Sequence, residues 1–256
     1  MSPEMDRRQL FALGAIGTGI AAATFAEPVF AQAGDAPADG PSAGNAKWDL
    51  KPMPFPEKLK NTAPAGISVK THEEHYKLYS GYVTKVNEIR KKLAQLGVPG
   101  EKAGNQTFSD IRELKVEYTF ALGGVKNHEI YFNILGGQGG KPTGEIGDLI
   151  DKAFGSYERW AADLKQTGIA ARGWVWLAHD YTENTFFNYI GDAQNTFPVW
   201  HATPILALDV YEHAYYYDFQ TGRAKYIDAF LKSVDWDAVN KYLAVAKAVA
   251  NAANGK

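Results

Sequence analysis

Two long helical segments, each with a histidine inside its apolar stripe, constrain the fold of this chain more than any other feature. In residues 68–96, apolar and aromatic side chains recur every three or four positions and therefore share one face of a helix. A second helical region follows Thr107, and we expect it to break at Gly123-Gly124 before it resumes. The expected stripes are His75, Tyr79, Tyr82, Val86, Ile89 and Leu93 in the first segment, and Val125, His128, Phe132 and Leu135 in the second. We expect the two helices to pack as a hairpin.

The ends of the first helix carry recognisable signals. Thr71 with Glu74 fits a capping box, and Ser68 is a competing start. Gly97 and Pro99 are expected to end the helix.

The sequence changes character after the second helix. A glycine-rich loop at 136–144 and helical patterns at 145–154 and 157–167 precede three short aromatic and β-branched segments, which predict strands that we expect to be antiparallel. These strand segments are 173–180, 184–192 and 204–211, and helical pattern returns at 213–219, 225–233 and 237–250. The predicted fold class is α+β: an N-terminal helical hairpin domain (66–138) followed by a C-terminal α/β domain with a three-stranded antiparallel sheet (139–256).

The first 33 residues are expected to lie outside this fold. Arg7-Arg8 ahead of the weakly apolar run Leu10–Phe25 resembles a twin-arginine export signal, and Ala31-Gln32-Ala33 fits cleavage after Ala33. The run of 16 residues is shorter than the ~20 that a spanning helix needs. We therefore expect a periplasmic protein that folds and loads its cofactor before export and has no membrane attachment after cleavage. A membrane anchor and a disordered tail are the alternatives.

The segment that follows the signal, 34–65, reads as a Pro/Gly/Ala-rich linker and N-terminal arm. Trp48, Leu50, Met53 and Phe55 are expected to pin the later part of the arm to the domain.

Composition limits the chemistry that the domain can perform. The chain has no cysteine, which excludes disulfides, zinc ribbons, iron–sulfur clusters and thiol catalysis. Its 27 basic and 29 acidic residues give no sign of nucleic-acid binding. Histidines, carboxylates, hydroxyls or a bound cofactor must therefore carry any activity, and the chain has six histidines.

Three of these histidines and one aspartate form a candidate metal site. His75 and His128 lie on the apolar faces of the two long helices, and Asp209 and His213 are spaced four residues apart after the last strand. A lone histidine on such a face is usually a hydrogen-bonded core residue, but two on paired helices weaken that interpretation. Three nitrogens and one oxygen suit Mn, Fe or Zn, and an open position would make the site catalytic. The other histidines, His72, His179 and His201, are expected at the surface.

Five ordered motifs add a family resemblance. They are GISVKTHEEHY, GGVKNHEIYFNIL, GKPTGEIGDLI, ARGWVWL and LDVYEHAYYYDF. From about Asp49 to Ala250 the chain resembles the iron/manganese superoxide dismutases, whose signature Asp-x-Trp-Glu-His-Ala-Tyr-Tyr is similar to the last motif. The resemblance implies that His75, His128, Asp209 and His213 bind one Mn or Fe ion, with solvent as a fifth ligand. It also implies that the metal cycles between +3 and +2 and converts superoxide to oxygen and hydrogen peroxide.

Two other functions stay open at this point. The chain could be a divergent metal-binding or structural protein with this fold and little dismutase activity. It could also be a related metal-dependent oxidoreductase that uses another small oxidant.

The resemblance also assigns residues around the metal. Manganese-type members have Gly-Gly-x-x-Asn-His on the second helix and take a solvent-binding glutamine from the sheet region. Here Gly124 and Gln194 match that pattern, which slightly favours Mn, although an ordinary loop amide is the alternative for Gln194. The gateway tyrosine is expected eight residues after the first ligand, where this chain has Val83. Tyr82 is one residue early but only about 20° from His75 around a helix, so we assign it the gateway role, with Tyr79 behind it; a local bulge could restore the register.

Several aromatic and interface positions depart from the family pattern. Tyr211 and Phe132 stand where tryptophan is usual, while Trp174 and Trp176 remain to cover the site. Glu212 resembles the residue that reaches across a homodimer interface to the partner's metal-bound histidine. Tyr216 would normally meet a histidine that is missing here, since Tyr79 replaces it, and Arg223 matches an interface or funnel arginine.

Overall fold

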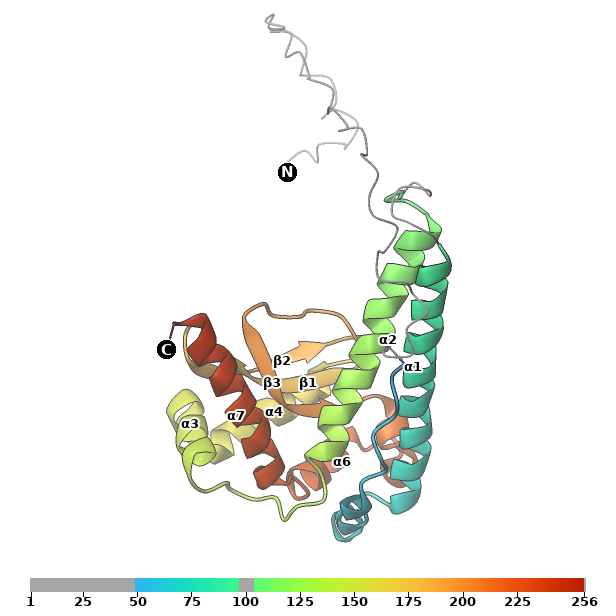
Figure 1. The fold of residues 1–256 in the computed structure, drawn as a ribbon. Helices are drawn as coiled ribbons and strands as arrows, with labels where there is room; N and C mark the ends of the chain where they lie inside the picture. Colours follow the sequence, from blue (N-terminus) through green and yellow to red (C-terminus); the bar gives the residue numbers. More distant parts are fainter. Residues whose placement is uncertain (1–48, 97–103, 256) are drawn as a thin grey trace, which may run out of the picture. The chain divides into compact units, whose positions relative to one another are not determined.

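The computed structural model describes residues 49–96 and 104–255 (Figure 1). The expected export signal, its cleavage site and Trp48 lie outside the described residues, as do Gly97 and Pro99. Among the described residues, no helix combines the length and apolar character that crossing a membrane requires.

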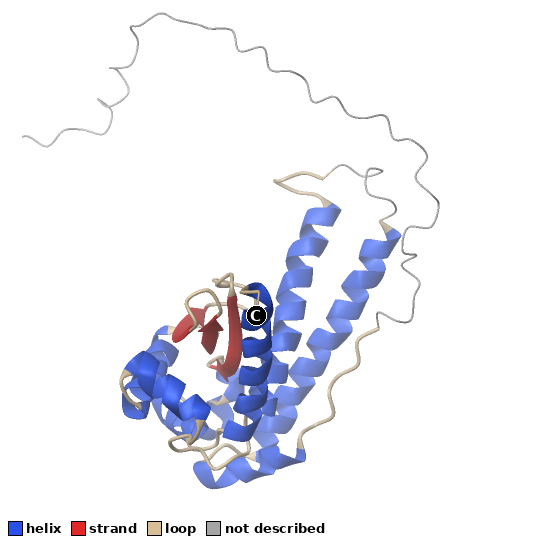
Figure 2. Ribbon diagram, turned by 60° about the vertical axis from the view of Figure 1, so that its left-hand side comes forward, coloured by secondary structure: helices blue, strands red, loops and turns tan. Residues whose placement is uncertain are grey.

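The two long helices lie side by side as the predicted hairpin (Figures 1 and 2). Helix α1 spans Val69–Gln95 and helix α2 spans Asp110–Asn133. Each begins with a serine cap: the Ser68 hydroxyl accepts from the Thr71 N–H, and the Ser109 hydroxyl accepts from the Arg112 N–H. Ser68, rather than Thr71, is therefore the first cap.

Helix α2 runs through Gly123-Gly124 without a break, so the predicted interruption is wrong. The two glycines instead allow the loop after β2 and helix α1 to pack closely against α2. A Cβ at Gly123 would come 2.3 Å from the carbonyl oxygen of Gln194, and a Cβ at Gly124 would come 2.8 Å from the ring of Tyr82. Helix propensity disfavours glycine, but close packing at these two positions requires it.

The three predicted strands form one antiparallel sheet of order β2-β1-β3. Strand β1 spans Trp174–Asp180, β2 spans Thr185–Gly191 and β3 spans Ala202–Asp209. In the register, Trp174 lies between Gly191 and Asp209, so these three share one face of the sheet. Helix α2 contacts β3, and helix α4 (Tyr157–Ala170) contacts β1 and β2.

Further helices lie before and after the strands in the chain. Helix α3 covers Glu145–Phe154 as predicted, and its connection to α2 contains the expected loop at 136–144. After β3, the predicted helix at 213–219 is a 3-10 turn, η3 (Glu212–Ala214), and a single α-turn, α5 (Tyr216–Phe219). Two further helices follow it: α6 (Arg223–Leu231) and α7 (Trp236–Ala253).

The N-terminal arm is held against α1, and it contains a 3-10 helix, η2 (Glu57–Ala65), that the sequence did not predict. Leu50, Met53 and Phe55 pack on the core as expected. The backbone of Leu50 exchanges two hydrogen bonds of 2.9 Å with the side chain of Asn87.

Two of the three histidines expected at the surface are buried. His72 is buried because helix η2 covers it: the hydroxyl of Thr62, which lies in η2, is 2.9 Å from the Nε2 of His72. His179 is enclosed because β1 is the central strand and is buried along nearly its whole length. His201 is exposed, as predicted, and its ring stacks on Tyr181.

Candidate metal centre

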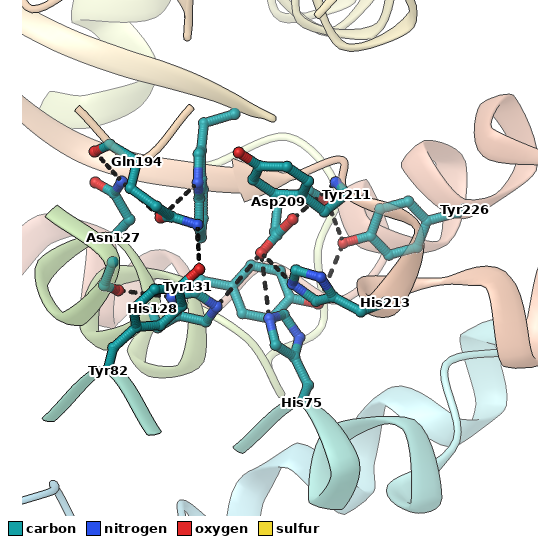
Figure 3. A network of polar contacts seen from close by, with 12 residues as sticks. His75, Tyr82, Asn127, His128, Tyr131, Gln194, Asp209, Tyr211, His213 and Tyr226 are labelled. Atoms are coloured by element: carbon teal, nitrogen blue, oxygen red, sulfur yellow. Dashed lines mark hydrogen bonds and ion pairs between the residues drawn. The ribbon is translucent and has the colours of Figure 1, made fainter. Parts of the chain in front are cut away.

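Three imidazoles and one carboxylate converge where the helical hairpin meets the sheet (Figure 3). The Nε2 atoms of His75, His213 and His128 lie 3.1, 3.3 and 3.6 Å from one oxygen, Oδ2 of Asp209. The four candidate ligand atoms all lie within 4.8 Å of one another. The structure thus brings together all four residues that the sequence singled out as metal ligands.

Each side chain is aimed by its own element. His75 and His128 project from α1 and α2, Asp209 ends β3, and His213 lies in η3. The Tyr211 N–H donates to Oδ1 of Asp209 at 2.9 Å, which leaves Oδ2 facing the three rings. The backbone therefore fixes the carboxylate before any ion binds.

The tautomer of His128 is set by a backbone carbonyl. Its Nδ1 lies 2.6 Å from the carbonyl oxygen of Gly124, which can only accept a hydrogen bond. Nδ1 must therefore carry the proton, and the lone pair is on Nε2. That Nε2 is buried and has no hydrogen-bond partner among the described residues.

Burial keeps two of the rings neutral. It lowers the pKa of His75 to about 4 and the pKa of His128 to about 3. Burial also opposes charge on His213, but the Asp209 carboxylate outweighs it and raises the pKa of that ring. Burial would likewise raise the pKa of Asp209, yet His213 and His75 hold it well below its usual value.

This donor set fits one Mn or Fe ion. A fully buried carboxylate and three converging nitrogens need a shared positive charge, because a buried charge without a partner is costly. The unpartnered Nε2 of His128 is the atom that an ion would satisfy. His213 is the one ligand candidate that reaches solvent, with 29% of its side chain exposed.

Gln194 lies beside the site and has three partners (Figure 3). It is buried in the loop after β2, where its Oε1 accepts from the indole N–H of Trp174 at 3.0 Å. Its Nε2 donates to the hydroxyl of Tyr82 at 3.2 Å. Asn127 donates to the backbone carbonyl of Gln194 at 3.1 Å. The amide orientation is consequently fixed, with its NH₂ group toward Tyr82.

Tyr82 reaches the centre without a change in helix register. Helix α1 is regular throughout, so the bulge considered above is absent. The Tyr82 ring lies 5.5 Å from that of His128. Together with Lys85, Phe120 and His213 it lines an opening of about 400 Å³. Tyr82 is thus the tyrosine between the candidate ligands and solvent on this side.

The other departures from the family pattern occupy distinct places. Tyr79 is fully buried: its hydroxyl accepts from the Met53 N–H at 2.7 Å, and burial raises its pKa to about 12. Phe132 packs against the ring of His75 at 5.1 Å. Tyr211 stacks on His213 at 5.4 Å, and Trp174 meets the edge of His128 at 5.1 Å.

A second opening lies on the other side of His213. It has a volume of about 560 Å³ and is lined by Tyr211, Glu212, Arg172 and Arg223, among others. Glu212 is exposed. Arg223 is anchored, since it donates to the carbonyl of Ala171 at 2.7 Å.

Sequence reasoning missed one support of Asp209. The buried Tyr226 hydroxyl donates to the Asp209 carbonyl at 2.8 Å and lies 3.2 Å from the hydroxyl of Tyr131. Tyr131 lies in the GGVKNHEIYFNIL motif, but nothing there indicates a contact with Tyr226, and Tyr226 falls in a helical pattern with no motif to mark it. Only the fold reveals how the two tyrosines support Asp209.

A helical hairpin joined to a three-stranded antiparallel sheet, with a His₃Asp cluster between them, defines a mononuclear metalloprotein of the α+β class. The family model for iron/manganese superoxide dismutases, C-terminal domain, matches residues 142–242. Among similar proteins, the superoxide dismutase [Fe] of Aquifex aeolicus (strain VF5) is 39% identical over 187 residues, which cover 72% of this chain and 88% of that protein. The superoxide dismutase [Mn] 1 of Halobacterium salinarum is 32% identical over 195 residues, covering 75% and 92%. The chain therefore belongs to the iron/manganese superoxide dismutase family.

Proposed function

We propose that this protein is a superoxide dismutase that converts superoxide to oxygen and hydrogen peroxide with one Mn or Fe ion held by His75, His128, Asp209 and His213. The observation that carries the proposal is the convergence of three Nε2 atoms on one buried carboxylate oxygen. The similar dismutases named for iron and for manganese support the reaction and the metal pair.

The residues around the ligands have separate tasks. When bound, either ion supplies a one-electron couple between its +3 and +2 states. Gln194 holds an amide N–H toward the Tyr82 hydroxyl, and the pair is placed to position a proton donor next to the centre. Trp174, Phe132 and Tyr211 pack against the rings of His128, His75 and His213 and limit the access of bulk water to them. An anionic substrate would enter past Tyr82 or beside Arg223, whose charge favours it.

We favour Mn over Fe as the native metal. The glutamine beside the site, Gln194, comes from the sheet region, as in the manganese-type pattern. On α2, Gly124 has no side chain, and the ring of Tyr82 lies against it. Of the relatives above, the one named for iron has the higher identity, so the assignment needs a direct measurement.

Separate reconstitution with the two metals tests the function. Metal-free protein is loaded with Mn or with Fe, the metal content is measured, and each form is assayed for dismutation. We expect one ion per chain and a higher rate for the Mn form. Stoichiometric metal with a rate no higher than that of the free ion would overturn the proposal. Equal or higher activity of the Fe form would overturn the metal preference alone.

We also propose export and dimerisation. Arg7-Arg8 and the apolar run after them support twin-arginine export to the periplasm. An exposed Glu212 followed by exposed Tyr216 and Tyr217 supports a homodimer interface at this surface. Cell fractionation of the wild type and of an Arg7→Lys/Arg8→Lys variant tests the first proposal. Light scattering of the wild type and Glu212→Ala tests the second, and a wild-type monomer at micromolar concentration would refute it.

A further inference from the structure

A continuous series of aromatic rings leads from the metal centre to the edge of the sheet. The ring of His128 meets Trp174 edge-on at 5.1 Å between centroids. Trp174 stacks on Trp176 at 6.3 Å and 16°. Trp176 stacks in turn on Tyr189 at 4.9 Å and 27°. Tyr189 lies on β2, which is an edge strand, and its side chain is partly exposed.

The strand register builds this series. Trp174 and Trp176 are two residues apart on β1 and so share a face, and Tyr189 is directly opposite Trp176 on β2. Gly191 lies opposite Trp174, and a Cβ there would come 2.4 Å from the indole ring of Trp176. A glycine at this position is therefore what allows the second indole to stack in line.

The composition makes these rings the most readily oxidised groups near the site. Thiols and thioethers react first with oxidants in most proteins. This chain has no cysteine, and of its three methionines only Met53 lies among the described residues. Met53 is on the N-terminal arm, beyond Tyr79. Indole and phenol rings are then the nearest electron donors in the sheet.

Proton positions give the series a direction. The indole N–H of Trp174 donates to an amide oxygen, which is too weak a base to remove its proton. The Trp176 N–H is buried and has no hydrogen-bond partner among the described residues. An indole that loses an electron must therefore remain a cation at either position. Tyr189 differs, because its partly exposed phenol can release a proton to water as it loses an electron.

We propose that Trp174, Trp176 and Tyr189 form a protective route by which an oxidising equivalent leaves the metal centre and emerges at Tyr189. The proposal rests on the function proposed above, which supplies both the oxidant and the reductant. It assigns Tyr189 a role outside dismutation itself.

If a bound ion in its +2 state supplied one electron to product hydrogen peroxide, hydroxide and a hydroxyl radical would result, and the ion would be left in its +3 state. The radical takes one electron from Trp174 and becomes a second hydroxide. Trp174 recovers its electron from Trp176, and Trp176 from Tyr189, whose phenolic proton passes to water and neutralises that second hydroxide. A superoxide anion then gives one electron to the tyrosyl radical, which takes up one proton to regenerate the phenol, and oxygen leaves.

Tyr211, which is partly exposed and stacks on His213 at 5.4 Å, is one competing end point, and Tyr82 is another. Its ring is 5.5 Å from that of His128 and it is also partly exposed. Its hydroxyl accepts a hydrogen bond from Gln194 and borders the opening to solvent. Oxidation confined to Tyr82 would mean that the equivalents leave by the substrate opening and not through the sheet.

The test treats iron-loaded protein with measured amounts of hydrogen peroxide. Freeze-quenched samples are examined by electron paramagnetic resonance, and oxidised residues are located by peptide mass spectrometry. The variants are Tyr189→Phe and Trp176→Phe, with Tyr157→Phe as the matched control. Tyr157 is also partly exposed and packs on tryptophan, at 5.5 Å from Trp160, but that cluster is not part of the series.

We expect a tyrosyl radical and oxidised Tyr189 in the wild type and in Tyr157→Phe. In Tyr189→Phe the radical signal should fall several-fold, oxidation should move to Trp176, Trp174 or His128, and activity should be lost after several-fold less peroxide. In Trp176→Phe, Tyr189 should be present but unmodified.

Three results would overturn the route: modification of Tyr82 or His128 without Tyr189 in the wild type, equal peroxide sensitivity of Tyr189→Phe, or equal labelling of Tyr189 in metal-free protein. Metal content and dismutase rate are measured before peroxide is added. A failure of the proposed function is thereby distinguished from a failure of the route.

Discussion

Gly124 of α2 lies directly against the ring of Tyr82 on α1, so that a Cβ at Gly124 would come 2.8 Å from two atoms of that ring. Tyr82 in turn accepts a hydrogen bond from Gln194. The absence of a side chain at Gly124 thus determines where the Tyr82 ring and the Gln194 amide lie beside the metal centre.

Substitution of Gly124 should displace Tyr82. Gly124→Ala is expected to cost about 1–3 kcal/mol of stability through overpacking, and to lower the dismutase rate because Tyr82 leaves Gln194. Thermal unfolding and the rate of the metal-loaded protein check both effects. Gly81→Ala is the matched control, because Gly81 is an exposed helical glycine with nothing within 4 Å of an added Cβ. It should gain about 0.5–1 kcal/mol, and an equal loss in both variants would contradict the steric argument.

Loss of the Gln194 amide should affect both stability and activity. Gln194→Leu leaves the fully buried N–H of Trp174 without its acceptor, which should cost about 1–3 kcal/mol. Removal of such a support commonly lowers activity or metal affinity by about 10–100-fold. Denaturant unfolding and the rate per bound metal ion measure the two effects. A wild-type rate per metal ion would show that the amide is only structural.

Tyr79 should secure the N-terminal arm. Tyr79→Phe removes the acceptor of the Met53 N–H and is expected to cost about 1 kcal/mol. Cleavage of residues 49–56 by a protease should become several-fold faster. Tyr76→Phe removes the bond to the Met53 carbonyl from the same helix and is a second test of the same anchor, with a similar effect expected. Unchanged cleavage in both variants would mean that the paired bonds of Asn87 hold the arm alone.

The elements could be predicted where local sequence determines them. The period of α1, the competing start at Ser68 and the aromatic strand segments all depend on residues close in the chain. The four candidate ligands were found because motifs mark them. The errors arose where distant elements decide the environment: Thr62 encloses His72, and Tyr82 and Gln194 fill the space at Gly123-Gly124. The support of Asp209 by Tyr226 could not be predicted either, since it depends on how α6 packs beneath the end of β3.

Removal of the metal should lower the stability of the protein, and reloading the metal should restore it. Without an ion, the buried Asp209 carboxylate keeps the Tyr211 N–H and the imidazoles as partners, but no bound cation balances its charge, and the Nε2 of His128 stays unsatisfied. A ligand that binds only the folded state adds about 2.7 kcal/mol when its free concentration is 100 times Kd. Melting temperature is measured after chelation and after addition of Mn²⁺. The variant Asp209→Asn should lose most of that increase, and a full increase in it would place the ion elsewhere.

The buried His72 should make the protein less stable in mild acid. Burial lowers its pKa to about 4 despite the opposing charge of Asp218, while the unfolded chain keeps the usual value of 6.5. Between these values the unfolded state binds more protons, so stability is complete above about pH 6.5 and falls as the pH drops toward 4. The full shift corresponds to roughly 3 kcal/mol. Metal-loaded wild type and His72→Gln are compared by urea unfolding from pH 7.5 to 4.5. The variant should be less stable at pH 7.5 because the glutamine replaces a packed ring, but its stability should fall less steeply; parallel curves would assign the acid sensitivity to other groups.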